Sequence, residues 1–121
     1  MASTNEIVQA YMAAWNEKDE TKRRQLLEEA WADDGRYTDP MSDAPGRDAL
    51  AALISQFQQQ MPGASIVATS GIDEHHGRLR FAWKMKAPDG STGMEGIDIG
   101  QLAEDGRLQS IVGFFEPPPA A

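Results

Sequence analysis

The sequence predicts a single α+β domain, with helices in the first half of the chain and antiparallel strands in the second. Before Gly63 the apolar residues recur at the spacing of amphipathic helices, and after it they alternate with polar residues as in strands. Turn-forming pairs such as Asp89-Gly90 and Asp105-Gly106 divide the second half into hairpin-length segments. Helices followed by antiparallel strands are typical of a fold in which the helices cover one face of a curved sheet.

Three helices are expected before Gly63. The first, which Ser3 or Thr4 can cap, has an apolar stripe made of Ile7, Val8, Tyr11, Met12 and Trp15. The second begins near Asp19 and Glu20, ends before Asp33, and buries Leu26, Leu27, Ala30 and Trp31. The third ends at Pro62-Gly63 and has an apolar face made of Leu50, Leu53, Ile54, Phe57 and Met61.

Strands are expected near residues 35–39, 65–74, 78–87, 92–103 and 108–116. The clearest is the strand at 78–87, where Leu79, Phe81, Trp83 and Met85 alternate with Arg78, Arg80, Lys84 and Lys86. Residues 1–116 are therefore expected to form one domain. Residues 117–121 are expected to form a loose tail, because their prolines cannot continue a ladder.

Composition narrows the class of protein. A length of 121 residues suits one domain, and a net charge of −8 argues against nucleic-acid and anionic-membrane partners. The absence of cysteine excludes disulfides, thiol nucleophiles and cysteine metal sites. The chain shows neither an apolar run of transmembrane length nor a signal-peptide layout, so a cytoplasmic protein is expected.

Two polar residues in the first half are candidates for chemistry. Tyr11 lies in the apolar stripe of the first helix, so its hydroxyl needs a buried partner, and a core tyrosine bonded to a backbone carbonyl is the alternative. Asp39 precedes Pro40, which favours extended backbone, and an exposed Asx turn is the alternative there.

Asp98 is the third candidate and lies within a strand. Gly96 and Gly100 share its strand face, and two glycines on one face indicate a close approach or an emptied space. A carboxyl group pointing into that space would have a raised pKa. The alternative is that Ile97 and Ile99 face the core and Asp98 faces solvent. If Tyr11, Asp39 and Asp98 converge in one apolar cavity, they can move a proton.

His75 and His76 are adjacent and are expected at a polar hairpin tip, although a single histidine acting as a general base stays open. They lack the helical spacing of a paired metal-ligand motif, and no metal site is predicted.

Several segments, taken in order, resemble the nuclear transport factor 2-like superfamily. They are VQAYMAAW at 8–15, WADDGRYTDP at 31–40, the helix-opening Gly46, GID at 96–98 and DGRL at 105–108. The resemblance spans nearly the whole chain, and within the superfamily it points to ketosteroid isomerases and SnoaL-type polyketide cyclases. It implies a cone-shaped α+β barrel in which three N-terminal helices pack on a strongly curved, mixed, mainly antiparallel sheet.

The resemblance also implies roles for residues. By matching position, Tyr11 and Asp98 would form an oxyanion hole and Asp39 would shuttle a proton, as in ketosteroid isomerases. In the cyclases the acid/base role would fall on Asp98. The implied activity is cofactor-free acid/base chemistry, either isomerisation or aldol-type cyclisation, on an apolar cyclic ketone. The walls of the central pocket would be Trp15, Tyr37, Phe57, Phe81, Trp83, Ile111 and Phe115.

Two departures from the family pattern keep other functions open. Leu53 and Ile54 stand where ketosteroid isomerases often place a supporting tyrosine, and Trp83 is bulkier than the usual pocket residue. Both features favour a non-catalytic binder of a small apolar ligand. A third possibility is an assembly domain that forms a homodimer through the exposed sheet face. Ile97, Ile99 and the basic row of Arg78, Arg80, Lys84 and Lys86 would supply the contacts.

Overall fold

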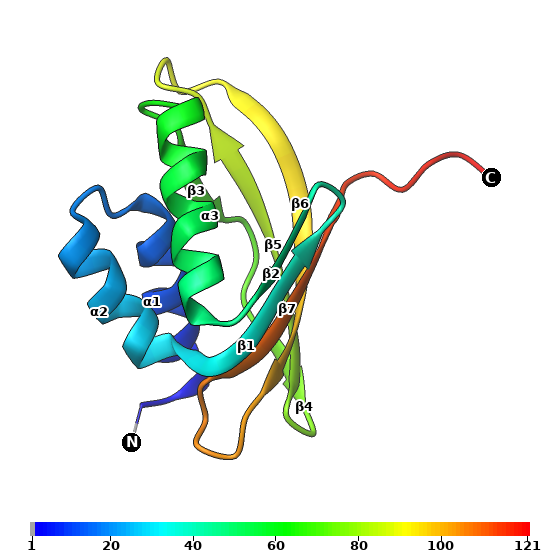
Figure 1. Cartoon of the computed structure of the whole chain (residues 1–121). Helices are drawn as coiled ribbons and strands as arrows, with labels where there is room; N and C mark the ends of the chain where they lie inside the picture. The colour runs from blue at the N-terminus through cyan, green and yellow to red at the C-terminus, as the bar shows by residue number, and fades with distance from the viewer. Residues whose placement is uncertain (1) are drawn as a thin grey trace.

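Three helices pack against one face of a strongly curved, seven-stranded sheet in this computed structural model, which describes residues 2–121 (Figure 1). The helices are α1 (Thr4–Asn16), α2 (Glu20–Ala30) and α3 (Arg47–Gln60). The strands are β1 (Trp31–Asp39), β2 (Ser42–Pro45), β3 (Ser65–Ala68), β4 (Asp73–His75), β5 (Arg78–Lys86), β6 (Thr92–Leu102) and β7 (Leu108–Phe115). The α+β class expected from the sequence is confirmed.

Local caps fix where the helices begin. Ser3 and Glu6 form a reciprocal capping box at α1, in which the Glu6 backbone N–H donates to Ser3 Oγ at 3.2 Å. At α2 the side chain of Asp19 accepts from the Lys22 backbone N–H. Gly46 precedes α3 with a φ of 91°, a conformation that residues with a Cβ rarely adopt.

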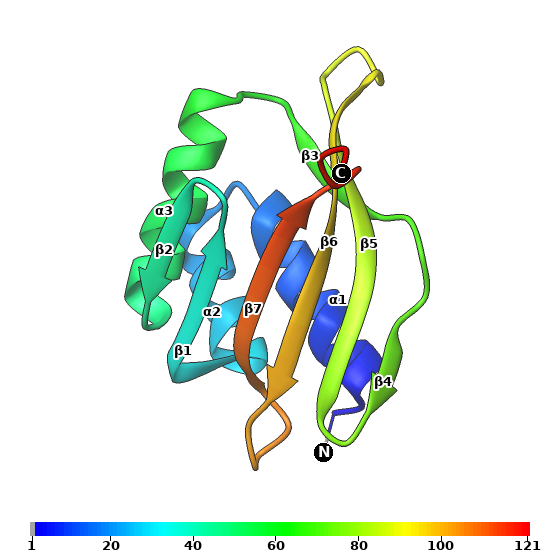
Figure 2. The same ribbon diagram turned by 90° about the vertical axis from the view of Figure 1, so that its right-hand side faces the viewer.

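The sheet runs in the order β2-β1-β7-β6-β5-β3, and β4 also pairs with β5. The β1–β7 pair is parallel, and the other pairs within residues 2–121 are antiparallel. Within the same residues β2 and β3 end the order without pairing to each other. The sheet is therefore curved but not closed into the barrel that the resemblance implies. Figure 2 shows the outer face of the sheet, with all three helices behind it.

Trp31 corrects the prediction for the second helix. It follows α2 and begins β1, so this strand is longer than the one expected at residues 35–39. Trp31 lies four residues after Leu27 and so continues a helical stripe, but its backbone pairs with Leu108 of β7. Tertiary pairing with β7 overrides the local pattern.

Two other segments differ from expectation. β2 was not predicted, and it is held by pairing with β1 and by an Arg36–Asp43 ion pair of 2.6 Å. The strand expected at 65–74 is interrupted, because Ser70 Oγ accepts the hydrogen bond from the Ala82 backbone N–H that a ladder carbonyl would otherwise take. The remaining three strand predictions are confirmed to within one residue.

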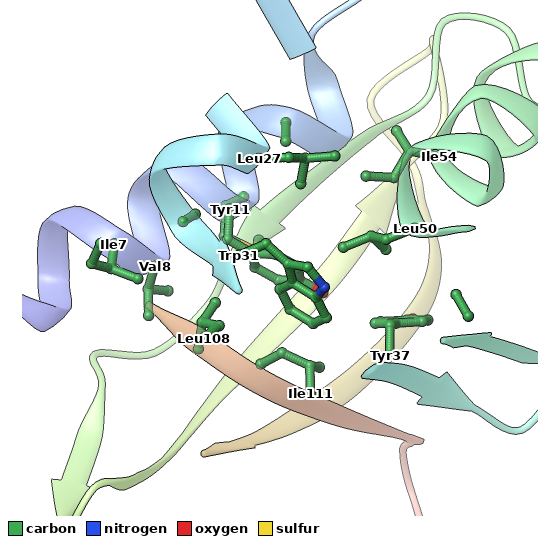
Figure 3. Packing of buried hydrophobic residues seen from close by; sticks show 14 of the residues in the cluster. Ile7, Val8, Tyr11, Leu27, Trp31, Tyr37, Leu50, Ile54, Leu108 and Ile111 are labelled. Atoms are coloured by element: carbon green, nitrogen blue, oxygen red, sulfur yellow. The ribbon is translucent and has the colours of Figure 1, made fainter. Parts of the chain in front are cut away.

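The core lies between the helices and the inner face of the sheet (Figure 3). Trp31 is fully buried and stacks on Tyr11, with ring centroids 5.5 Å apart. Leu27 and Ile54 approach from α2 and α3, and Ile111 from β7 (Figure 3). This packing fixes Tyr11 between helix and sheet.

Residues 117–121 extend away from the sheet (Figure 1), and the domain boundary at 116 stays a prediction. Within residues 2–121, none of the helices combines the length and the apolar character needed to cross a membrane.

Candidate functional site

Asp98 and Asp39 lie on either side of Gly113 on the inner face of the sheet. Asp98 is 5% exposed and its neighbour Ile99 is 44% exposed, which settles the strand orientation that the sequence left open. Asp98 pairs with Gly113 of β7, and a Cβ at Gly113 would lie 3.1 Å from Asp98 Oδ1 and 3.4 Å from the Cβ of Asp39. A glycine at this position therefore leaves room for two acidic side chains from β1 and β6.

Trp83 holds the Asp98 carboxyl group from the opposite side. Its indole Nε1–H donates to Asp98 Oδ1 at 3.0 Å. The indole reaches Asp98 by lying across Gly96, where a Cβ would overlap the ring. Gly96 of β6 thus admits a ring, and Gly113 of β7 separates two acids. Gly100, the other glycine on the Asp98 face of β6, allows a close approach, because a Cβ there would lie 2.9 Å from Ile111 Cδ1.

Burial raises the pKa of Asp98 to about 7, because the carboxylate loses its hydration. The Trp83 donor opposes this rise by stabilising the ionised form, while the negative charge of Asp39 adds to it. Asp98 is therefore a buried acid with a pKa near neutral pH, which suits a group that gives or takes a proton.

Asp39 is held by two donors at the end of β1. The Tyr37 hydroxyl donates to Oδ2 at 2.7 Å, and the Met41 backbone N–H donates to Oδ1 at 2.8 Å. The bond from Met41 is the Asx turn that the sequence offered as an alternative, since an Asx side chain accepts from the backbone N–H two residues on. Asp39 makes this turn and also lines the cavity, so both interpretations apply. Burial raises the pKa of Tyr37, and the hydrogen bond to Asp39 raises it further.

The Tyr11 hydroxyl is buried and has no hydrogen-bond partner among residues 2–121. The alternative of a core tyrosine bonded to a backbone carbonyl is therefore wrong. Burial raises its pKa well above the usual value, and the nearby charge of Asp98 adds to the rise. An unsatisfied buried hydroxyl costs about 1–3 kcal/mol, which a ligand oxygen in the cavity would recover.

These groups line one cavity of about 250 Å³ near the C-terminal end of α3. The three predicted catalytic residues, Tyr11, Asp39 and Asp98, come together there. Five of the predicted wall residues also line it: Trp15, Tyr37, Phe57, Trp83 and Phe115. Phe81 and Ile111 do not. They point into the packed core, where they are 2% and 0% exposed.

The sequence profile of the SnoaL-like domain matches residues 8–111. The chain belongs to the SnoaL-like family. Within the nuclear transport factor 2-like superfamily, this is the branch that the cyclase resemblance indicates.

Solved structures agree with this SnoaL-like assignment. A candidate isomerase of the SnoaL-like family from Agrobacterium tumefaciens is 38% identical, with a TM-score of 0.88, and the match covers 95% of this chain and 100% of that one. An NTF2-like protein of unknown function from Exiguobacterium is 18% identical, with a TM-score of 0.74 and coverage of 93% and 99%. A protein described as a candidate SnoaL-like polyketide cyclase from Jannaschia is 13% identical, with a TM-score of 0.69 and coverage of 96% and 90%. The last two show the fold alone. No curated protein matches the chain.

The sequence interpretation missed seven residues that line the cavity of this SnoaL-like chain: Met12, Met41, Gln60, Met61, Ile66, Met85 and Met94. A strand-face signal existed for two of them, because Met85 follows Trp83 and Met94 precedes Gly96 at a spacing of two. Met41 gave no such signal, because it lies in the turn between β1 and β2, where neither strand nor helix periodicity applies.

His75 and His76 lie at the β4–β5 hairpin tip, outside the residues that line the cavity. Their Nδ1 atoms are 3.1 Å apart, and both side chains are exposed. In residues 2–121 no group of three or more histidine, cysteine or acidic side chains is placed to hold a metal ion.

Proposed function

We propose that this SnoaL-like protein is a cofactor-free enzyme that performs acid/base chemistry on an apolar cyclic ketone, by isomerisation or aldol-type cyclisation. The observation that carries this proposal is the Tyr11 hydroxyl, which has no hydrogen-bond partner and lines an apolar cavity. The same cavity is lined by Asp98, whose pKa is raised to about 7, and by a second carboxyl group, that of Asp39. The description of the 38% identical relative as a candidate isomerase supports it.

Each group has a distinct role in the proposed reaction. Ionised Asp39 accepts a proton from the carbon next to the ketone carbonyl, and the C–H electron pair moves to form an enolate. Tyr11 and protonated Asp98 donate hydrogen bonds to the developing enolate oxygen. Asp39 then returns its proton to a different carbon, which completes an isomerisation without any external oxidant or reductant.

Isomerisation of a β,γ-unsaturated cyclic ketone by the purified protein tests the proposal, with the conjugated enone followed by its ultraviolet absorbance. Asp39→Asn keeps the shape of the side chain but removes the base. We expect turnover to fall about 10²–10⁴-fold, the usual contribution of a general base. The matched control is Asp48→Asn, because the Asp48 side chain is 95% exposed and does not line the cavity. Equal turnover in the wild type and Asp39→Asn would show that Asp39 is not the base.

One observation favours a second function, that of a ligand binder without turnover. Both Asp39 oxygens already accept hydrogen bonds, from Tyr37 and from the Met41 backbone, and these bonds compete with a proton taken from carbon. In a binder, Tyr11 and Asp98 would hold a carbonyl oxygen and no carbon would lose a proton. Saturable ketone binding without turnover, in both the wild type and Asp39→Asn, would select this function.

A second copy of the chain is the proposed protein partner. Figure 2 shows the outer face of the sheet. This face carries the cross-strand pairs Ile97–Phe114 and Ile99–Val112, and Phe114 is 52% exposed. Beside this apolar patch Lys84 and Glu95 pair across β5 and β6, so the face carries both signs of charge and can meet its own copy. Sedimentation at micromolar concentration should give a dimer, and a monomer would remove this partner.

A further inference from the structure

Every methionine between residues 2 and 121 lines the cavity. The chain has six methionines, and the five after Met1 all line this one cavity: Met12, Met41, Met61, Met85 and Met94. They come from α1, the β1–β2 turn, the end of α3, β5 and β6. Methionines so far apart in sequence converge on one place only because the fold brings their five segments together.

Leucine, which has a similar size, has the opposite distribution. Leu27, Leu50, Leu79 and Leu108 are among the buried core residues, and within residues 2–121 neither leucine nor valine lines the cavity. General apolarity therefore does not explain the methionines, since either residue type would satisfy it. The packed core uses the stiffer side chain, whereas the cavity uses the unbranched, polarisable thioether that adapts to different surfaces.

We infer that these five methionines form a deformable collar, which lets one carbonyl anchor accept compact cyclic ketones of different outline. The inference rests on the proposed function, because the anchor is the Tyr11–Asp98 end of the same site. Met41 and Met61 are 73% and 42% exposed, so they lie at the mouth of the cavity, while Met12 is almost fully buried. The ligand oxygen binds at the acids, and its variable part lies among thioethers.

The cavity volume sets the size of this ligand class. At about 250 Å³ the cavity lies below the range of roughly 300–1,000 Å³ that is typical of pockets for drug-sized ligands. The substrate class is therefore a ketone with one or two rings. A four-ring body would have to project past Met41 and Met61 into solvent, and its outer rings would gain little contact.

Binding constants for a panel of ketones test the collar without any need for turnover. The probes are 1-indanone, 2-tetralone and 4-phenylcyclohexanone, with a four-ring steroid ketone for comparison. Trp15 and Trp83 line the cavity, so quenching of tryptophan fluorescence reports occupancy. A hydrophobic pocket of fixed shape discriminates a single methylene by about 10–200-fold. We expect the three compact ketones to bind within tenfold of one another and the steroid more weakly than all three.

A matched pair of double variants isolates the flexibility of the collar. Met41→Ile with Met61→Ile introduces β-branched, stiff side chains, whereas Met41→Leu with Met61→Leu keeps similar volume without branching at Cβ. Both positions are partly or largely exposed, so folding should survive in both proteins. The isoleucine pair should widen the spread of binding constants beyond tenfold, and the leucine pair should stay close to the wild type.

The possible results separate this inference from the proposed function. A wild-type spread above tenfold, an isoleucine pair identical to the wild type, or a steroid that binds as tightly as 2-tetralone would each overturn the collar. Narrowly spread binding constants without ketone turnover would instead support the collar and count against the enzyme. Turnover of ketones together with widely spread binding constants would support the enzyme and count against the collar.

Discussion

Two aspartates in one cavity differ in their burial and in their hydrogen-bond donors. Asp98 is buried and accepts a hydrogen bond from Trp83, and its pKa is raised because burial outweighs the effect of this donor. Asp39 is half-buried and accepts hydrogen bonds from two donors, the Tyr37 hydroxyl and the Met41 amide. These different surroundings distinguish the proposed acid, Asp98, from the proposed base, Asp39.

Trp83→Phe should move the pH profile of the enzyme upward. The active form of Asp98 is protonated, so kcat/KM should fall in the wild type as the pH rises through about 7. The indole N–H stabilises the ionised form, and removing it should raise the pKa of Asp98 further, by roughly one unit for a lost bond of about 1.5 kcal/mol. The midpoint of the decline in kcat/KM should therefore shift to higher pH. An unchanged midpoint would show that Asp98 does not control the profile.

Asp98→Asn should stabilise the fold while it lowers activity. The pKa of Asp98 is raised from 3.8 to about 7, so the folded state binds this proton more tightly than the unfolded chain does. The favourable contribution of Asp98 is therefore complete below pH 3.8, declines as the pH rises toward 7, and is lost above it. At pH 8 asparagine should raise the free energy of unfolding by about 2–4 kcal/mol, and at pH 4 by much less. Urea denaturation at both pH values measures this difference, and an equal gain at both would contradict the raised pKa.

At the scale of elements, the site depends on the register of β1, β7 and β6. Thr38 pairs with Val112 in the parallel β1–β7 ladder, and Asp98 pairs with Gly113 in the antiparallel one. This register places Asp39 of β1 and Asp98 of β6 on the two sides of Gly113 in β7, the strand between them. A slip of one residue in β6 would turn Asp98 to the outer face.

Gly113→Ala should reduce turnover without unfolding the protein. The added Cβ would lie 3.1 Å from Asp98 Oδ1, a tight contact that a side chain can relieve by shifting a few tenths of an ångström. We expect at least a tenfold loss in kcat/KM, because small displacements of catalytic groups are costly. Gly71→Ala is the matched control, since nothing lies within 4 Å of its Cβ position. Turnover equal to that of the control would show that the spacing of the two acids is not critical.

The elements also show what the sequence could and could not predict. Periodicity and caps located all three helices, because an apolar stripe and its capping residues are local features. β2 and the interruption after Ala68 were not predicted, because they depend on particular cross-strand contacts. These are the Arg36–Asp43 ion pair between β1 and β2, and the hydrogen bond from the Ala82 backbone N–H to the Ser70 hydroxyl. Phe81 and Ile111 were placed in the cavity because strand alternation gives the face of a residue but not its depth.

At the scale of the whole molecule, a packed core and an open cavity share one space between helices and sheet. Trp31 and the leucines fill the core, and aromatic and methionine side chains surround the cavity. Structures only 13–18% identical keep this fold, so the fold alone does not determine the reaction. The functional proposal therefore depends on Tyr11, Asp39 and Asp98 rather than on the architecture.

The most direct test of this account is the exchange of α-protons of 2-tetralone in deuterated water, followed by proton NMR. Exchange detects removal of a proton from carbon even when the natural substrate is unknown. We expect the wild-type protein to accelerate exchange well above the buffer rate, Asp39→Asn to abolish the acceleration, and Asp48→Asn to retain it. Saturable binding of 2-tetralone with exchange at the buffer rate would contradict the proposed enzymatic activity and would support a ligand binder instead.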